Sequence, residues 1–162
     1  MRIAIDTETE LITPTEPTPR LVCLSYADGD VSDLVGYRDA EAVVSLVVDS
    51  DATVIGHNFA FDASVLARHS PTLEAAVFRL YEQGRVRDTL LREQLARIAR
   101  GTLDTEGPMT LDALAQKYLG TTLDKGEDGW RLRYGELRET PLDAWPERAR
   151  AYPIADAVST LR

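Results

Sequence analysis

The sequence contains few of the residues that several common kinds of site require. Its single cysteine, Cys23, cannot form an internal disulfide. One cysteine with the two histidines, His57 and His69, cannot make the usual zinc ligand set either. Because Cys23 lies in the apolar run of residues 21–24, we expect it to pack as a small core hydrophobe.

Long apolar runs and low-complexity segments are also missing. The longest apolar stretches, around residues 43–48, fall far short of the roughly 20 residues that span a bilayer. The N-terminal residues lead directly into a strand-like run and lack the regions of a signal peptide. We therefore expect a cytoplasmic protein without membrane contacts. A length of 162 residues with 44% hydrophobic content predicts a single domain over residues 1–162.

Lysine is scarce, and the charge balance is acidic. The formal net charge is −9, and the 18 basic residues comprise sixteen arginines and two lysines. An acidic surface repels phosphate, which argues against a simple basic binding face. It leaves open an enzyme that reaches phosphate through metal ions. Arginine is the better bidentate phosphate ligand, although a GC-rich genome gives the same bias.

The feature that organises the chain is the apolar run of residues 2–5 followed by Asp6-Thr7-Glu8. Period-two apolar residues predict a strand, and residues two apart in a strand point to the same face. Asp6 and Glu8 would therefore converge on one point at the strand end. Carboxylate oxygens suit hard divalent cations such as Mg²⁺, so the pair is a candidate metal site.

The elements that follow predict a mixed α/β fold. Strands over residues 20–27 and 31–37, joined by the turn Asp28-Gly29-Asp30, give a three-strand antiparallel meander with the first strand. A helix over 39–48 and a strand over 53–57 then predict a parallel addition to the sheet.

From residue 58 onward the sequence predicts mostly helices. Helices are expected from residue 58, over 71–83, after a cap at Asp88 and after a cap at Thr110. In the Asp88 helix, Leu91, Leu95 and Ile98 keep helical spacing. The predictions for the remaining segments are a loop over 11–19, a short strand over 85–87, irregular chain over 123–139, and a last helix that Pro141 or Pro146 opens.

Two further pairs share a helix face with four-residue spacing. Asn58 and Asp62 lie at the start of a helix that directly follows a strand, and Tyr152 and Asp156 lie on the last helix. Each pair is weak evidence by itself. The order of the three pairs along the chain and their settings make them specific.

These motifs resemble those of the DEDD superfamily of 3′-5′ exonucleases, in its tyrosine branch. That family carries Asp-x-Glu, Asn-x-x-x-Asp and Tyr-x-x-x-Asp, present here as Asp6/Glu8, Asn58/Asp62 and Tyr152/Asp156. The sequence is most similar to the proofreading exonuclease domain of family A DNA polymerases, with supporting similarity at residues 20–25, 110–115 and 130–137. The histidine branch has a histidine where this chain has Ala151. The resemblance covers the whole chain and implies a ribonuclease H-like mixed sheet flanked by helices.

The resemblance implies cleavage of the 3′-terminal phosphodiester with two Mg²⁺ or Mn²⁺ ions. It assigns Asp6 to both ions, Glu8 and Asp156 to the ion that activates water, and Asp62 to the second ion. Close carboxylates repel one another, so metal binding is expected to release protons. Tyr152, with an ordinary pKa near 10, is expected to orient the water rather than act as a strong base. His57 is expected to be a packed or hydrogen-bonding neighbour.

Substrate contacts are expected at three residues. The resemblance places Leu11 or Ile12 against the terminal base, with packing inside the loop as the alternative. Asn58 would hydrogen-bond the terminal nucleotide or cap a helix. Candidates for contact with the phosphate backbone, or for an ordinary solvated surface, are Arg85, Arg87, Arg131 and Arg133.

The expected partner is the 3′ end of single-stranded DNA, with a polymerase module in cis or in trans, and we expect a monomer. The alternatives are a ribonuclease D-like RNA exonuclease and a catalytically silent nucleic-acid-binding domain. Pro153 departs from the family pattern because proline lacks a backbone donor and disturbs a helix. It predicts a last helix that is kinked at Pro153 or begins there.

Overall fold

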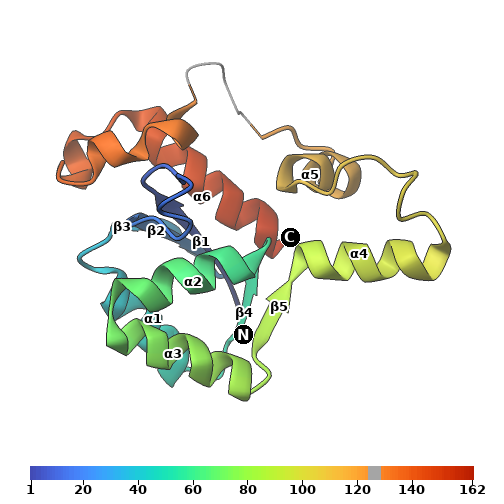
Figure 1. Ribbon diagram of the computed structural model, residues 1–162, viewed down its shortest axis with the longest axis horizontal. Coiled ribbons are helices and arrows are strands. Elements are labelled where there is room, and N and C mark those ends of the chain that lie inside the picture. The colour runs from blue at the N-terminus through green and yellow to red at the C-terminus, as the bar shows by residue number, and fades with distance from the viewer. Residues whose placement is uncertain (124–128) are drawn as a thin grey trace.

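The computed structural model describes residues 1–123 and 129–162. Within these residues one five-stranded sheet has the order β3-β2-β1-β4-β5, with helices on both faces (Figure 1). Its strands are β1 (Arg2–Thr9), β2 (Leu21–Ala27), β3 (Ser32–Gly36), β4 (Thr53–Gly56) and β5 (Val86–Asp88). The α-helices are α1 (Ala40–Asp49), α2 (Phe59–His69), α3 (Pro71–Glu82), α4 (Thr89–Arg100), α5 (Leu111–Leu119) and α6 (Glu147–Leu161). Short 3₁₀ turns are η1 (Trp130–Leu132), η2 (Tyr134–Leu137) and η3 (Leu142–Ala144).

The sheet confirms the predicted mixed α/β topology. Strands β1, β2 and β3 form the antiparallel meander, while β4 pairs parallel to β1 and β5 pairs parallel to β4. The predicted short strand at 85–87 is found one residue later. Strand β1 is therefore central, and both of its faces are covered.

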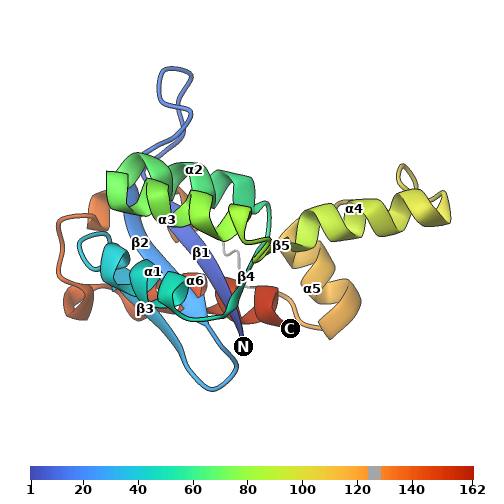
Figure 2. The same ribbon diagram turned by 90° about the horizontal axis from the view of Figure 1, so that it is seen from below.

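Each face of the sheet has its own apolar core. Ile3 and Ile5 of β1 pack with α1, α2 and α3 on one face. On the other face, Val22 and Cys23 of β2 pack with α6 and the 3₁₀ segment before it, through Tyr134 and Trp145. Cys23 is fully buried, as expected for a core hydrophobe. Figure 2 shows β1 running between the α1–α3 layer and α6.

Helix α4 projects from the sheet, with α5 beside it (Figures 1 and 2). The apolar stripe that its spacing defines faces solvent: Leu91, Leu95 and Ile98 are 54–66% exposed. The buried side chains of α4 are Glu93 and Arg97. Polar contacts therefore hold this part of the chain together.

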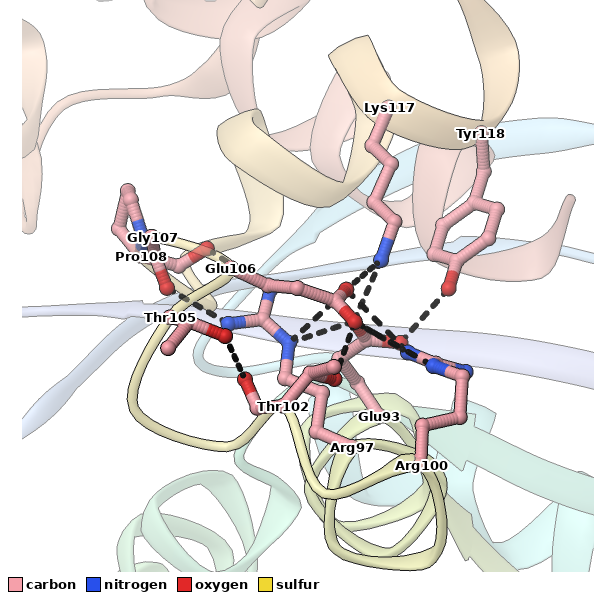
Figure 3. A network of polar contacts seen from close by, with 10 residues as sticks. All are labelled: Glu93, Arg97, Arg100, Thr102, Thr105, Glu106, Gly107, Pro108, Lys117 and Tyr118. Carbon is pink, nitrogen blue, oxygen red and sulfur yellow. Dashed lines mark hydrogen bonds and ion pairs between the residues drawn. The ribbon is translucent and has the colours of Figure 1, made fainter.

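Those contacts centre on the carboxylate of Glu93 (Figure 3). It accepts from Arg97 Nε at 2.7 Å, from Lys117 Nζ at 2.9 Å and from the Tyr118 hydroxyl at 2.8 Å. Lys117 also donates to Glu106 at 2.6 Å. The network joins α4 to α5 and to the loop between them.

Element ends follow the predicted capping residues at several places. Asp88 caps α4 and Thr110 caps α5 through their side chains. Pro141 precedes η3 and Pro146 precedes α6. Of the segment expected to be irregular, residues 129–139 contain η1 and η2, and residues 124–128 lie outside the described chain. Across residues 1–123 and 129–162, no helix has the length and apolar character needed to cross a bilayer.

Candidate active site

Strand β1 presents side chains to both layers of the fold. Because successive residues in a strand alternate, Asp6 and Glu8 share one face, and Ile3, Ile5 and Thr7 share the other. Ile3 and Ile5 pack in the core with α1–α3, so Asp6 and Glu8 point toward α6. Both carboxylates lie near the carboxyl end of the central strand.

Helix α6 brings the last motif to the same place. One carboxylate oxygen from each of Asp6, Glu8 and Asp156 lies within 4.8 Å of the other two. Tyr152, one turn earlier on α6, lies beside Asp156 and is half-buried. Residues from the beginning and end of the sequence thus meet at one point.

Asp62 reaches this end of β1 from the opposite layer. It is buried on α2, and its Oδ1 accepts from the Thr7 amide at 2.9 Å and from the Thr7 hydroxyl at 2.6 Å. The pairing of β1 with β4 stops at Ala4, so the Thr7 amide on that side is available to a side chain. Asp62 therefore lies behind Thr7, and it is not part of the 4.8 Å cluster.

Burial and mutual repulsion raise the pKa values of the acidic groups. Burial raises the pKa of Asp6 well above its usual range, and the charges of the other three carboxylates raise it further. Burial also raises the pKa of Glu8, as do the charges of Asp156 and Asp62, while Arg131 opposes the shift. For Asp62, burial raises the pKa to about 7 against the opposing hydrogen bonds from Thr7.

The arrangement fits divalent cations. Carboxylate oxygens are the ligands that Mg²⁺ and Mn²⁺ prefer, and the oxygens of Asp6, Glu8 and Asp156 are close enough to share an ion. A bound cation would also remove the repulsion that raises the pKa values of these acids. These three residues could hold one ion, and Asp62 lies near enough to influence the same centre.

Helix α6 runs through Pro153, so the expectation that it begins there is wrong. Proline has no amide to donate to the carbonyl four residues earlier. That carbonyl, on Ala149, accepts instead from the Tyr134 hydroxyl at 2.9 Å. Ser25 donates to the Pro153 carbonyl at 2.8 Å. Side chains from other elements thus donate hydrogen bonds to the backbone carbonyls of the turn that Pro153 disturbs.

The expected substrate residues lie in different settings. Leu11 and Ile12 are 56% and 61% exposed, so the alternative that they pack inside the loop is wrong. Asn58 is exposed, has a left-handed φ of 60°, and makes no capping hydrogen bond with its side chain. Its expected capping role is therefore wrong.

Asp88 performs the capping instead. Its carboxylate accepts from the amides of Asn58 and Phe59 at the start of α2 and from Leu90 and Leu91 at the start of α4. The sequence identified Asp88 as a cap for α4, but nothing local in the sequence indicates its contact with α2. His57, next to this junction, hydrogen-bonds the Thr89 hydroxyl at 2.8 Å.

The four arginines that the sequence offers as phosphate contacts also lie in different settings. Arg85 is committed to structure, because its guanidinium donates to the carbonyls of Val47, Val48 and Ala52 near the end of α1. Arg87 is exposed and donates to nearby backbone carbonyls. Arg133 lies over the Trp130 ring at 4.7 Å. Arg131 is exposed and close enough to lower the pKa of Glu8.

Comparison with known proteins gives the class to which this fold and site belong. The chain matches the 3′-5′ exonuclease family of the DNA polymerase A type over residues 1–162. It belongs to that family, within the DEDD superfamily of exonucleases. Members of this superfamily generally use divalent metals. No curated protein matches the chain in sequence.

Two solved structures have the same fold. The EXO domain of Aedes aegypti Nibbler aligns with a TM-score of 0.66 at 16% identity, over 99% of this chain and 74% of that one. Escherichia coli RNase D, an exoribonuclease involved in structured RNA processing, aligns with a TM-score of 0.56 at 22% identity. That alignment covers 98% of this chain and 36% of the RNase D chain, so the chain spans about a third of RNase D. At these identities the similarity concerns the fold alone.

Proposed function

We propose that this protein is a 3′-5′ exodeoxyribonuclease that removes nucleoside 5′-monophosphates from the 3′ end of single-stranded DNA. The observation that carries the proposal is the convergence of Asp6, Glu8 and Asp156 within 4.8 Å, in a chain of the 3′-5′ exonuclease family. The proposed setting is proofreading in DNA replication or repair in the cytoplasm. The protein would act as a monomer with a polymerase module in cis or in trans.

The acids of the site would hold two Mg²⁺ or Mn²⁺ ions. Asp6 would contribute to both ions, Glu8 and Asp156 to the first, and Asp62 to the second. When bound, such a pair polarises the phosphate and lowers the pKa of water, which supplies a nucleophile near neutral pH.

Tyr152 would orient the attacking water. Burial raises the pKa of its hydroxyl above the ordinary value, and the charges of Asp156 and Glu8 raise it further. The hydroxyl therefore stays protonated near neutral pH and acts as a hydrogen-bond donor rather than as a base. Its place on α6, one turn before Asp156, puts it beside the acidic cluster.

The exposed pair Leu11 and Ile12 would contact the terminal base. They follow the end of β1 after one residue, Glu10, so a base held against them would lie near the carboxylates at the strand end. Asn58 would supply a polar contact to the terminal nucleotide, because its side chain makes no capping hydrogen bond at α2.

RNA is the second candidate substrate, because RNase D is described as an exoribonuclease. The test uses 5′-labelled single strands of DNA and RNA with one sequence, each incubated with Mg²⁺. We expect the DNA to shorten stepwise from its 3′ end and faster than the RNA. Shortening of the RNA alone would replace the DNA proposal with an RNase D-like function.

A further inference from the structure

We propose that Tyr134 is a positioning residue whose hydroxyl keeps α6 in place at Pro153 and so holds Tyr152 and Asp156 at the acidic cluster. The inference rests on the proposed function of that cluster. Tyr134 lies at the start of η2, outside the three motifs.

Pro153 leaves a specific gap in the helix. In an α-helix the amide of each residue donates to the carbonyl four residues earlier. Pro153 has no amide proton, so the carbonyl of Ala149 loses its usual donor. Ala149 is 0% exposed, and water is therefore a poor substitute. The Tyr134 hydroxyl donates to this carbonyl at 2.9 Å and takes the place of the missing amide.

Packing fixes the ring that carries this hydroxyl. Tyr134 is fully buried, with its ring centroid 6.0 Å from that of Trp145 and 6.5 Å from that of Tyr152. It thus contacts the neighbour of Pro153 directly. On the following turn, the Ser25 hydroxyl ties the Pro153 carbonyl to β2 at 2.8 Å.

The turn of α6 around Pro153 carries two residues of the candidate active site. Tyr152 immediately precedes Pro153, and Asp156 follows it by three residues on the same helix. A buried carbonyl without a donor is costly, so α6 would bend or shift if the Tyr134 hydroxyl were removed. Asp6 and Glu8 lie on the central strand and would not follow that movement.

A double-mutant cycle with Tyr134→Phe and Pro153→Ala tests the inference. The Phe variant keeps the ring but removes the donor, and the Ala variant supplies a backbone amide that can donate to Ala149. We expect Tyr134→Phe in the wild-type background to lower kcat about tenfold, with KM for DNA unchanged. We also expect it to weaken Mn²⁺ binding about tenfold, measured by calorimetry.

In the Pro153→Ala background the same Tyr134→Phe change should alter neither kcat nor Mn²⁺ affinity. Tyr37→Phe is the matched control, because that hydroxyl donates to the exposed Glu139 instead. It should leave both quantities unchanged. Equal losses from Tyr134→Phe in both backgrounds would overturn the inference. Lower thermal stability with unchanged kcat and Mn²⁺ affinity would also overturn it.

The outcomes separate this inference from the proposed function. A wild-type protein that binds Mn²⁺ but leaves nucleic acid intact contradicts the nuclease, and the cycle in Mn²⁺ affinity then decides the role of Tyr134. If the wild type is active and Tyr134→Phe has the same effect with Pro153 as with Pro153→Ala, only the role of Tyr134 is contradicted. A wild type that neither binds Mn²⁺ nor cleaves contradicts both.

Discussion

At the residue scale, Thr7 links the two sides of the site. It stands between Asp6 and Glu8 in β1 but points to the opposite layer, where its amide and hydroxyl both donate to Asp62. Two donors on one oxygen fix the orientation of that carboxylate. Thr7 therefore connects the acid on α2 to the acids that face α6.

Replacing Thr7 with valine tests this link. Valine matches the shape of threonine and keeps the backbone donor, but it lacks the hydroxyl that donates at 2.6 Å. Loss of such an outer-sphere contact typically costs about 10–100-fold in metal affinity or activity, so we expect about tenfold weaker Mn²⁺ binding. The matched control is Thr15→Val in the exposed loop, which should bind Mn²⁺ like the wild type. Unchanged affinity in Thr7→Val would remove Thr7 from the site.

Tyr152 gives the second residue-scale prediction. If its protonated hydroxyl orients water, Tyr152→Phe should lower kcat about 10–100-fold, because proton-transfer and orienting groups typically contribute at that level or above. The variant should still bind Mn²⁺, since the carboxylates remain. Steady-state kinetics and calorimetry measure the two effects. A fully active Tyr152→Phe variant would contradict the orienting role.

At the scale of elements, α4 shows what helical spacing does and does not reveal. The spacing of Leu91, Leu95 and Ile98 correctly predicts a helix, and a stripe of this kind usually faces a core. Here the stripe is exposed, and Glu93 and Arg97 are buried on the other side. The reason is a set of ionic partners distant in sequence, including Lys117 on α5, which local spacing cannot predict.

Stability of the α4–α5 network should depend on pH. Burial raises the pKa of Glu93, but hydrogen bonds from Arg97, Lys117 and Tyr118 outweigh it and lower the pKa to about 2 from an ordinary 4.5. A lowered folded-state pKa means that the ionised carboxylate stabilises the fold above about pH 4.5. That contribution is lost as the pH falls toward 2.

The variant Glu93→Gln should therefore lower the free energy of unfolding by about 2 kcal/mol at pH 7, because it weakens charge-assisted hydrogen bonds in a buried network. The difference from the wild type should shrink below pH 4.5. Urea titrations at several pH values measure it. Glu136→Gln, which removes an exposed partner of Arg133, is the control and should change stability little. A pH-independent difference would contradict the ionic role of Glu93.

Helix α6 shows a second limit of prediction from sequence. Proline inside a helix suggests a kink or a new start, yet α6 passes through Pro153. The compensating donor, Tyr134, lies 19 positions earlier and in a different element. A single sequence gives no indication of which tyrosine makes such a contact. The capping of α2 by Asp88 is a similar case, because the contact spans about 30 residues.

At the scale of the whole molecule, the antiparallel meander and the parallel addition to the sheet were predictable from local signals, whereas the pairing of β4 with β1 brings together strands far apart in the sequence. The Asp28–Asp30 turn predicts the antiparallel hairpin of β2 and β3, and α1 between β3 and β4 in the sequence predicts that β4 adds parallel to the sheet. The position of Asp62 was less predictable. Its four-residue spacing from Asn58 suggests a shared direction, whereas the structure places Asp62 in a buried contact with Thr7 and Asn58 at the surface.

The layered arrangement of the whole molecule brings the residues of the site together. The central strand supplies Asp6 and Glu8, one layer supplies Asp62, and the other supplies Tyr152 and Asp156. Cations bound among these acids would join both layers to β1. Metal binding is therefore expected to stabilise the assembled fold as well as to support the reaction.

The most direct measurement follows 5′-labelled single-stranded DNA on a sequencing gel with wild-type protein and with Asp6→Asn. The account predicts a ladder of products shortened one nucleotide at a time from the 3′ end, with Mg²⁺ and not with EDTA. Asp6→Asn should be slower by about a thousandfold, because a metal centre supplies several kcal/mol of barrier reduction, while Asp30→Asn in an exposed turn should behave like the wild type. Intact DNA with the wild type and Mg²⁺, or equal rates for Asp6→Asn and wild type, would contradict the account.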